Sequence, residues 1–248
     1  MVTKEAKTSR HIEAREPLPV PESARVIQRS IIVRLESLVK GSGSALDPGF
    51  QAAWQEALFL VDSYQKAIAG NAKRTAACAV GCSSCCCHWV EDVNSFEAEA
   101  IAARLKRSLP DRIPTIIDRC NRDNAALSQL NALIEAKLAM LDPAFTEAID
   151  STELLLASFY RLRKPCPLLE GNSRSCLVYP LRPFTCRMYV SFSDPVKCSP
   201  GYADDNDITA YLFDLEKRAD ELIDALHFKF MKFEGDTGLR SLLLKYLA

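Results

Sequence analysis

The sequence predicts a mainly α-helical protein in which a helical shell surrounds a loop-rich core of cysteines. Three observations lead to this prediction. Apolar residues recur at helical spacing along much of the 248-residue chain. Alternating patterns typical of strands are confined to residues 177–192. All ten cysteines lie between residues 78 and 198. The helical segments therefore flank a central region whose composition is unlike theirs.

The first two helices are indicated by both spacing and end signals. Residues 22–40 carry apolar side chains at helical intervals, and a Gly-Ser-Gly-Ser stretch follows them. Asp47 followed by Pro48 has the pattern of an N-cap residue with proline at the first helical position. The helix that starts there should run to Ala69 and end at Gly70.

Further helices are expected after the first run of cysteines. Asn94 and Glu97 resemble a capping box that opens one of them. Asp142-Pro143 repeats the combination of cap and proline. Between residues 208 and 226, apolar residues recur at alternating spacings of four and three. This pattern favours an ordinary buried helical face over a coiled-coil seam. The expected segments are 94–107, 127–141, 143–160 and 208–226.

Length and composition favour one domain with a short appendage. Residues 1–21 are polar, and prolines alternate through the end of this stretch at positions 17, 19 and 21. We interpret them as a flexible N-terminal arm, because they lack the apolar side chains needed for packing. Residues 22–248 are then a single helical domain, with its cysteine core at 78–198.

Charge and hydropathy exclude several classes of protein. Lysine and arginine number 31 and aspartate and glutamate 32, so the net charge of −1 favours neither nucleic acid nor an anionic membrane as a partner. No apolar run approaches the length of a membrane-spanning helix, and the N-terminus lacks the apolar segment of a secretion signal. We therefore expect a cytoplasmic protein, in which thiols stay reduced and clustered cysteines bind metal or perform redox chemistry.

Eight cysteines form two sets of four along the chain. Short spacing between cysteines lets one tight turn direct two sulfurs at one ion, and both zinc and iron–sulfur clusters accept four thiolates. A thioredoxin-like pair at Cys82 and Cys85 is the competing interpretation, but the βαβ context of that motif is missing. The predicted ligands are Cys78, Cys82, Cys85 and Cys86 in one set and Cys166, Cys176, Cys186 and Cys198 in the other.

The adjacency of Cys85, Cys86 and Cys87 leaves the register of the first set open. Neighbouring side chains of an extended segment point to opposite faces, so two of these thiols would not easily share one ion. Either the turn is strongly folded, or these residues serve two metals, or one of them takes no part. Cys87 could replace either neighbour, and His88 directly after it could also supply a ligand.

The second set lies in a basic stretch. Between residues 161 and 198 there are seven cations and two anions, a net charge of +5. Because four thiolates around a divalent ion carry a net charge of −2, nearby cations would offset them and favour the ionised thiols. A solvated basic face and a binding site for an anion or nucleic acid are the alternatives.

The remaining candidates point away from other chemistries. Cys120 follows Ile116 and Ile117 at helical spacing, which indicates a buried core thiol. The whole chain contains three histidines. The sequence therefore does not support a hydrolytic triad or a His-based zinc protease site. Glycine-rich nucleotide loops and the nucleophile elbow of hydrolases are absent from the sequence.

The cysteine run and the later string together resemble a known family. Cys78-x₃-Cys82-x₂-Cys85-Cys86 is followed by Cys166-Pro-Leu-Leu, Cys176-Leu-Val-Tyr179, Arg182-Pro183 and Cys186-Arg187. This combination, over residues 78–198, is similar to the YkgJ-type cysteine-cluster family, described as a zinc- or iron-chelating domain. The resemblance implies that the eight predicted cysteines are the ligands. Some members of that family are linked to protein lysine methylation.

Three hypotheses for function follow from these features. The first is a cytosolic protein that chelates one or two zinc ions, or iron, through two clusters of cysteine thiolates. The second is an iron–sulfur or thiolate-bound iron centre with a redox or catalytic role, linked by the resemblance to protein modification. The third is a scaffold whose helical faces and basic segment dock an acidic protein partner.

Overall fold

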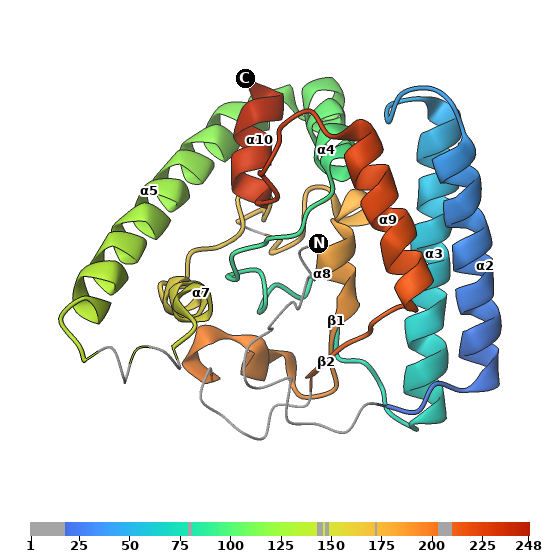
Figure 1. The fold of residues 1–248 in the computed structure, drawn as a ribbon, viewed down its shortest axis with the longest axis horizontal. Coiled ribbons are helices and arrows are strands. Elements are labelled where there is room, and N and C mark those ends of the chain that lie inside the picture. The colour runs from blue at the N-terminus through green and yellow to red at the C-terminus, as the bar shows by residue number, and fades with distance from the viewer. Residues whose placement is uncertain (1–17, 79–80, 143–145, 147–148, 172, 203–209) are drawn as a thin grey trace.

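The structure, a computed structural model, describes residues 18–248 except 79–80, 143–145, 147–148, 172 and 203–209. Most of the expected N-terminal arm, residues 1–17, therefore lies outside the described residues. The described chain is mainly helical, with one small two-stranded sheet, which confirms the predicted fold class. Its helices form two groups on either side of a region of loops (Figure 1).

One helical group contains α2 (Glu22–Lys40), α3 (Pro48–Asn71) and α9 (Lys217–Phe230), which lie side by side (Figure 1). The segments expected at 22–40 and 48–69 are confirmed as α2 and α3. Helix α2 packs against both α3 and α9, because its apolar residues recur on one face.

The other group contains α4, α5, α7 and α10. Helix α4 (Ser95–Ser108) begins after Asn94, as the capping box predicts, and Glu97 accepts hydrogen bonds from the backbone and side chain of Asn94. The longer α5 (Ile113–Leu138) contacts both α7 (Ser151–Arg161) and α10 (Leu239–Leu247). None of the described helices is long and apolar enough to cross a membrane.

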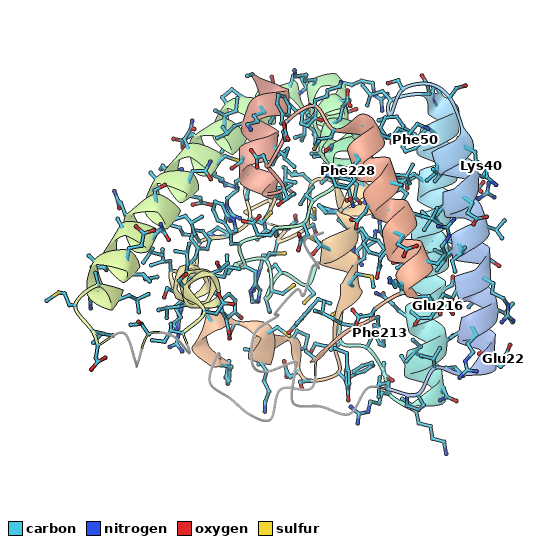
Figure 2. All side chains as sticks on the ribbon, in the orientation of Figure 1. Glu22, Lys40, Phe50, Phe213, Glu216 and Phe228 are labelled. Atoms are coloured by element: carbon cyan, nitrogen blue, oxygen red, sulfur yellow. The ribbon has the colours of Figure 1, made fainter. Side chains whose placement is uncertain are left out.

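Loops and short elements occupy the space between the two groups. Helix α8 (Phe184–Met188) leads directly into strand β1 (Tyr189–Ser191), which pairs antiparallel with β2 (Ala210–Leu212). Side chains fill this region, and sulfur atoms are visible among its loops (Figure 2). Single 3₁₀ turns connect the longer elements here and elsewhere, at Pro110–Arg112, Tyr179–Leu181, Pro195–Cys198 and Pro200–Tyr202.

The expected helix at 208–226 is wrong between residues 210 and 216, and its residues 208–209 lie outside the described part of the chain. Residues 210–212 form β2 instead, because they pair with β1, and the helix begins only at Lys217. The helix predicted at 143–160 begins at Ser151, where Asp150 accepts from the backbone N–H groups of Thr152 and Glu153. Residues 143–145 and 147–148 of that prediction lie outside the described residues.

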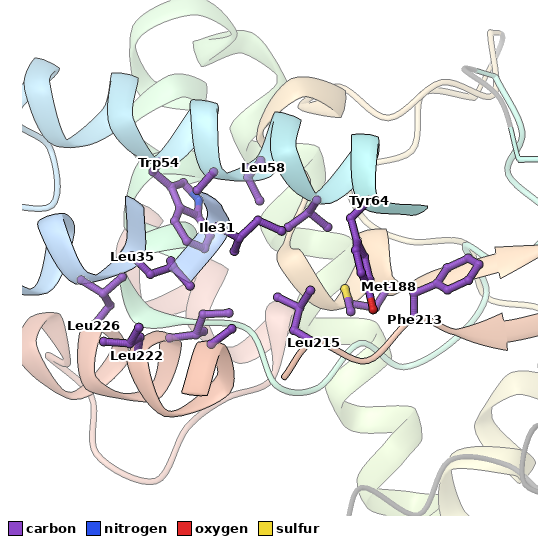
Figure 3. Close-up of a cluster of buried hydrophobic side chains, with 14 of the residues drawn as sticks. Ile31, Leu35, Trp54, Leu58, Tyr64, Met188, Phe213, Leu215, Leu222 and Leu226 are labelled. Atoms are coloured by element: carbon purple, nitrogen blue, oxygen red, sulfur yellow. The ribbon is translucent and has the colours of Figure 1, made fainter. Parts of the chain in front are cut away.

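Two hydrophobic clusters hold the helical groups together. The first lies between α2, α3 and α9 and extends to Met188 and Phe213 beside the sheet (Figure 3). Phe96 of α4 joins it through an edge-on contact with Trp54, with the ring centroids 4.8 Å apart. The second cluster lies between α4, α5 and α10, and Cys166 and Cys176 pack against it. The cysteine loops are therefore placed by the same contacts that form the core.

The first cluster can be tested on a single helix, α2. Leu35 is 1% exposed in this cluster, whereas Val33 on the same helix is 67% exposed. We predict that Leu35→Ala lowers the free energy of unfolding by about 2–5 kcal/mol, because it removes buried contacts and leaves a cavity. Val33→Ala should change it by less than about 0.5 kcal/mol. Urea unfolding checks both, and equal effects of the two substitutions would contradict the assignment of the buried face.

Candidate metal centre

Two cysteine-bearing segments that are distant in sequence meet between the helical groups. The backbone N–H of Cys166 donates to the carbonyl of Cys86 at 2.6 Å. Beside this contact, Nε of Arg174 donates to the hydroxyl of the buried Ser83 at 2.8 Å. One backbone and one side-chain hydrogen bond thus join the run at 78–87 to the segment that starts at 166.

The first cysteine run is a tightly folded turn. The N–H of Cys86 donates to Ser83 at 3.0 Å, and that of His88 donates to Cys85 at 3.1 Å. This folding brings the vicinal thiols of Cys85 and Cys86 into a hydrogen bond, which lowers the pKa of Cys85 and raises that of Cys86. Of the alternatives open for the vicinal cysteines, the strongly folded turn is therefore present.

The segment after Cys166 is held against α5. Nη1 of Arg119, on α5, donates to the carbonyl of Leu169 at 2.9 Å. Leu169 and Cys176 then form an antiparallel bridge, so Cys166 and Cys176 lie on two short strands of backbone that turn back on each other. Both cysteines pack against the second hydrophobic cluster.

Cys186 is positioned by the short helix α8, whose ends are anchored by buried polar groups. The carboxylate of Glu97 accepts from the N–H of Phe184 at 2.8 Å, at the start of α8. At its end, Nη1 of Arg187 donates to Oδ2 of Asp62 at 2.9 Å, and Gln65 donates to the carbonyl of Arg187 at 2.6 Å. Helices α3 and α4 therefore fix the placement of Cys186.

Cys78 and Cys198 meet at strand β1. The backbone N–H of Ser191 donates to Sγ of Cys78 at 3.3 Å, and its hydroxyl is hydrogen-bonded to the thiol of Cys198. Tyr189 donates to Sγ of Cys198 at 3.8 Å, and Tyr160 donates to its carbonyl at 2.6 Å. The first and last cysteines of the predicted ligand set are therefore neighbours.

The spatial grouping of thiols differs from their grouping along the chain. Electrostatic coupling between thiols, together with the hydrogen bonds above, defines a first thiol group of Cys78, Cys82, Cys85 and Cys198. By the same criteria, the second thiol group contains Cys86, Cys166, Cys176 and Cys186. Cys86 and Cys198 have thus exchanged places relative to the sets read from sequence. Cys85 contacts Cys86 and couples to both groups.

The thiols are gathered but not arranged as a finished coordination shell. Each of the ten cysteines is a free thiol. Across the described residues, no three His, Cys, Asp or Glu side chains have the geometry of a metal site as they stand. The grouping is therefore defined by hydrogen bonds and by electrostatic coupling.

Burial and cations act in opposite directions on the second thiol group. Burial raises the pKa of Cys166 to about 11 and raises that of Cys186 well above its ordinary range. The guanidinium groups of Arg240 and Arg182 oppose these increases, because a positive charge favours the thiolate. Burial also raises the pKa of Cys176, and Arg182 and Arg187 oppose this increase. Part of the basic stretch therefore faces the thiols and not the solvent.

Three candidates from the sequence lie outside the two thiol groups. Cys120 is fully buried in the second hydrophobic cluster, as its helical spacing predicts. Burial and the neighbouring Cys85 raise the pKa of Cys87, and Arg174, Arg240 and Arg163 oppose this increase. The ring of His88 stacks on Tyr160 with the centroids 3.9 Å apart, and burial lowers its pKa to about 4. His88 is therefore a neutral imidazole at pH 7.

Sequence reasoning missed the charged residues that hold these loops. Glu97 was recognised only as a cap, although its carboxylate also binds α8. Arg240 and Asp123 form an ion pair at 2.8 Å, and neither attracted attention in the sequence. The one available signal was the capping box, since an isolated arginine or aspartate carries no motif.

Comparison with known proteins adds no relatives. No family model, no curated protein and no solved structure matches the chain. The resemblance to the YkgJ-type family therefore remains a prediction.

Glu97 should make the stability of the protein depend on pH. Burial raises the pKa of its carboxyl to about 7 from an ordinary 4.5, against the hydrogen bonds from Asn94 and Phe184. The folded protein then holds this proton more tightly than the unfolded chain does. The contribution to the free energy of unfolding is therefore complete below pH 4.5 and is lost as the pH rises to 7, by an amount on the order of 3 kcal/mol.

We predict that Glu97→Gln flattens this decline, as urea unfolding between pH 4.5 and 7.5 of the metal-free protein would show. The substitution also lowers stability at every pH by about 1–3 kcal/mol, because an amide N–H then faces a backbone donor. The slope with pH is therefore the informative quantity. Glu135→Gln, at an exposed carboxylate, should retain the wild-type slope. An unchanged slope in Glu97→Gln would contradict the prediction.

Proposed function

We propose that this protein binds one or two metal ions, zinc or iron, through the thiolates of its two thiol groups. The eight candidate ligands are Cys78, Cys82, Cys85, Cys86, Cys166, Cys176, Cys186 and Cys198. A metal held there would join the loop at 78–87 to the segment at 166–198, inside the helical shell. A cytoplasmic location, where thiols stay reduced and available to a metal, is part of this proposal.

The observation that carries this proposal is the convergence of the two cysteine segments. Cys86 and Cys166 are joined through their backbones, and Cys186 couples to both from α8. Buried thiols with no other role would not need to gather from three separate segments. A set of soft thiolate donors is what zinc and iron–sulfur clusters select.

The surroundings of the thiols also fit a metal. Burial disfavours isolated thiolates, and a divalent ion removes this cost by replacing the thiol protons. Arg182 and Arg240 supply positive charge next to the second thiol group, which suits a thiolate centre of net negative charge. A structural zinc ion contributes an apparent 10–16 kcal/mol or so, comparable with the whole stability of a domain.

An iron–sulfur or thiolate-bound iron centre is the second candidate. Hydrogen bonds to the sulfurs are one of the means by which proteins set the potential of such centres. Ser191 and Tyr189 donate to the sulfurs of the first thiol group, at Cys78 and Cys198. In an iron centre at that group, these contacts would help to set its reduction potential.

Metal analysis of vicinal cysteine variants tests the proposed function and its register together. Protein purified without oxygen should contain zinc or iron in stoichiometric amounts, and acid-labile sulfide would distinguish an iron–sulfur cluster. We predict that Cys86→Ser lowers the metal content by half or more, because the second thiol group loses a ligand. Cys87→Ser should retain the wild-type content.

Cys120→Ala is the matched control at a buried thiol outside both groups. It should retain the wild-type metal content even where it lowers stability. Loss of metal in Cys87→Ser but not in Cys86→Ser would overturn the assigned register. Wild-type protein free of both metals, after anaerobic reconstitution with either one, would overturn the proposed function.

Metal removal should loosen the cysteine loops before the helices. The described loops contain little regular backbone hydrogen bonding, so a bound ion would be their main constraint. We predict that a chelator lowers the melting temperature and exposes the segments at 78–90 and 166–198 to limited proteolysis. The hairpin of α2 and α3 should stay resistant, because it has its own hydrophobic cluster. Unchanged melting and proteolysis after complete metal removal would contradict this prediction.

A further inference from the structure

Arg240 is a buried cation in an unusual setting. It lies in α10, is 1% exposed, and is among the largest fully buried side chains of the protein. Its guanidinium lies over the rings of Trp89 and Phe159, with the carbon Cζ 4.7 and 5.2 Å from their centroids. Trp89 follows the first cysteine run closely, and Phe159 belongs to α7. Cation–π contacts stabilise the charge but leave the N–H groups in the guanidinium plane free to donate.

The ion pair uses only one of the three nitrogens of the Arg240 guanidinium. Nε donates to Oδ2 of Asp123 at 2.8 Å. The other oxygen of Asp123 lies 3.5 Å from Nζ of Lys164, so two cations share one carboxylate. The three residues together therefore carry a net charge of +1. The positive charge of Arg240 is not cancelled within this cluster.

The two terminal nitrogens of Arg240 are the strongest sign that an acceptor is missing. Nη1 and Nη2 are both buried, and neither has a hydrogen-bond partner among the described residues. A buried charged donor without a partner costs more than the roughly 1–3 kcal/mol of a neutral one. A side chain that is retained at this cost should have an acceptor in the functional state of the protein.

Three thiols lie within the electrostatic reach of Arg240. They are Cys166, Cys120 and Cys87, and the guanidinium opposes the effect of burial on each of them. The placement agrees with this, because Cys120 and Leu239 of α10 belong to the second hydrophobic cluster, and Cys166 of the second thiol group packs against that same cluster. A thiolate at Cys166 is thus an acceptor that the protein could offer once a metal has displaced the thiol proton.

We propose that Arg240 is the counter-cation of the second thiol group, and that its Nη groups donate to the thiolate of Cys166 when this group holds a metal ion. The inference rests on the proposed function. Four thiolates around a divalent ion carry a net charge of −2, and the +1 of the Arg240 cluster offsets half of it. Arg240 acts here as a positioning residue, since it touches a ligand and not the ion.

The test separates this role from a purely structural one. Asp123→Asn with Arg240→Met removes the ion pair without leaving either of its charges buried alone, and methionine keeps the apolar contact with the two rings. Lys164 then retains the net charge of +1, so this variant removes the Nη donors and their local charge and leaves the net charge of the cluster unchanged. We expect zinc affinity, measured by competition with a chromophoric chelator, to fall about 10- to 100-fold. The metal-free variant should be as stable to urea as the metal-free wild type, because replacing a buried ion pair by neutral groups is often neutral or stabilising.

Asp118→Asn with Arg122→Met is the matched control, since this pair is exposed on α5. It should bind zinc with the wild-type affinity. Arg240→Lys keeps the charge but has fewer donors, and its affinity should lie between those of the wild type and the double variant. Zinc affinity of the Asp123–Arg240 variant within twofold of the wild type would overturn the inference alone. Wild-type protein that binds neither zinc nor iron would overturn the proposed function and this inference with it.

Discussion

Two loops of irregular backbone meet where the N–H of Cys166 donates to the carbonyl of Cys86, and the second thiol group depends on this junction because it brings Cys86 to Cys166. Closing so long a stretch of chain costs conformational entropy, and the loops contribute little regular hydrogen bonding in return. The loop after Cys166 is tied to α5 through Arg119, and His88, at the end of the first cysteine run, stacks on Tyr160 of α7. The site is thus constructed from the shell inward.

The polar ties are partly buried, and each connects the central segments to a different helix. Arg187 reaches Asp62 on α3, Glu97 on α4 binds the start of α8, and Arg119 on α5 holds the loop after Cys166. Buried polar groups add little net stability, but they specify one arrangement, because a misplaced partner leaves a charge unsatisfied. They can therefore set the register of loops whose apolar contacts alone would permit several.

The sequence predicted what is local and missed what is distant. Helices α2, α3 and α4 are evident from spacing and caps, because these signals lie within a few residues of one another. Strand β2 escaped notice because its structure depends on pairing with β1. The apolar spacing at 208–226 fits a helix equally well. Pairing with β1 therefore decides between helix and strand at residues 210–212.

The candidate site shows the same division. Chemical type and spacing were enough to select eight cysteines, but not to sort them, since the exchange of Cys86 and Cys198 depends on a folded turn and on β1. Arg240 could not be found from sequence. Helix α10 was not predicted, and the partner Asp123 lies on α5, which contacts α10 but is far from it along the chain. A single arginine can be recognised as a candidate functional residue only from its burial and its unpaired nitrogens, which the structure provides.

Buried thiols and buried guanidinium groups place opposite demands on the same interior. With its protons in place, the second thiol group is neutral and offers Arg240 no anion, so the cation is left partly unsatisfied. Ionised thiols without cations would be just as costly, because burial disfavours their charge. Exchange of the thiol protons for a metal ion relieves both costs at once, since it creates the anionic centre that the guanidinium lacks. Loading of the centre and ordering of the loops should therefore be coupled through charge as well as through the bonds to the metal.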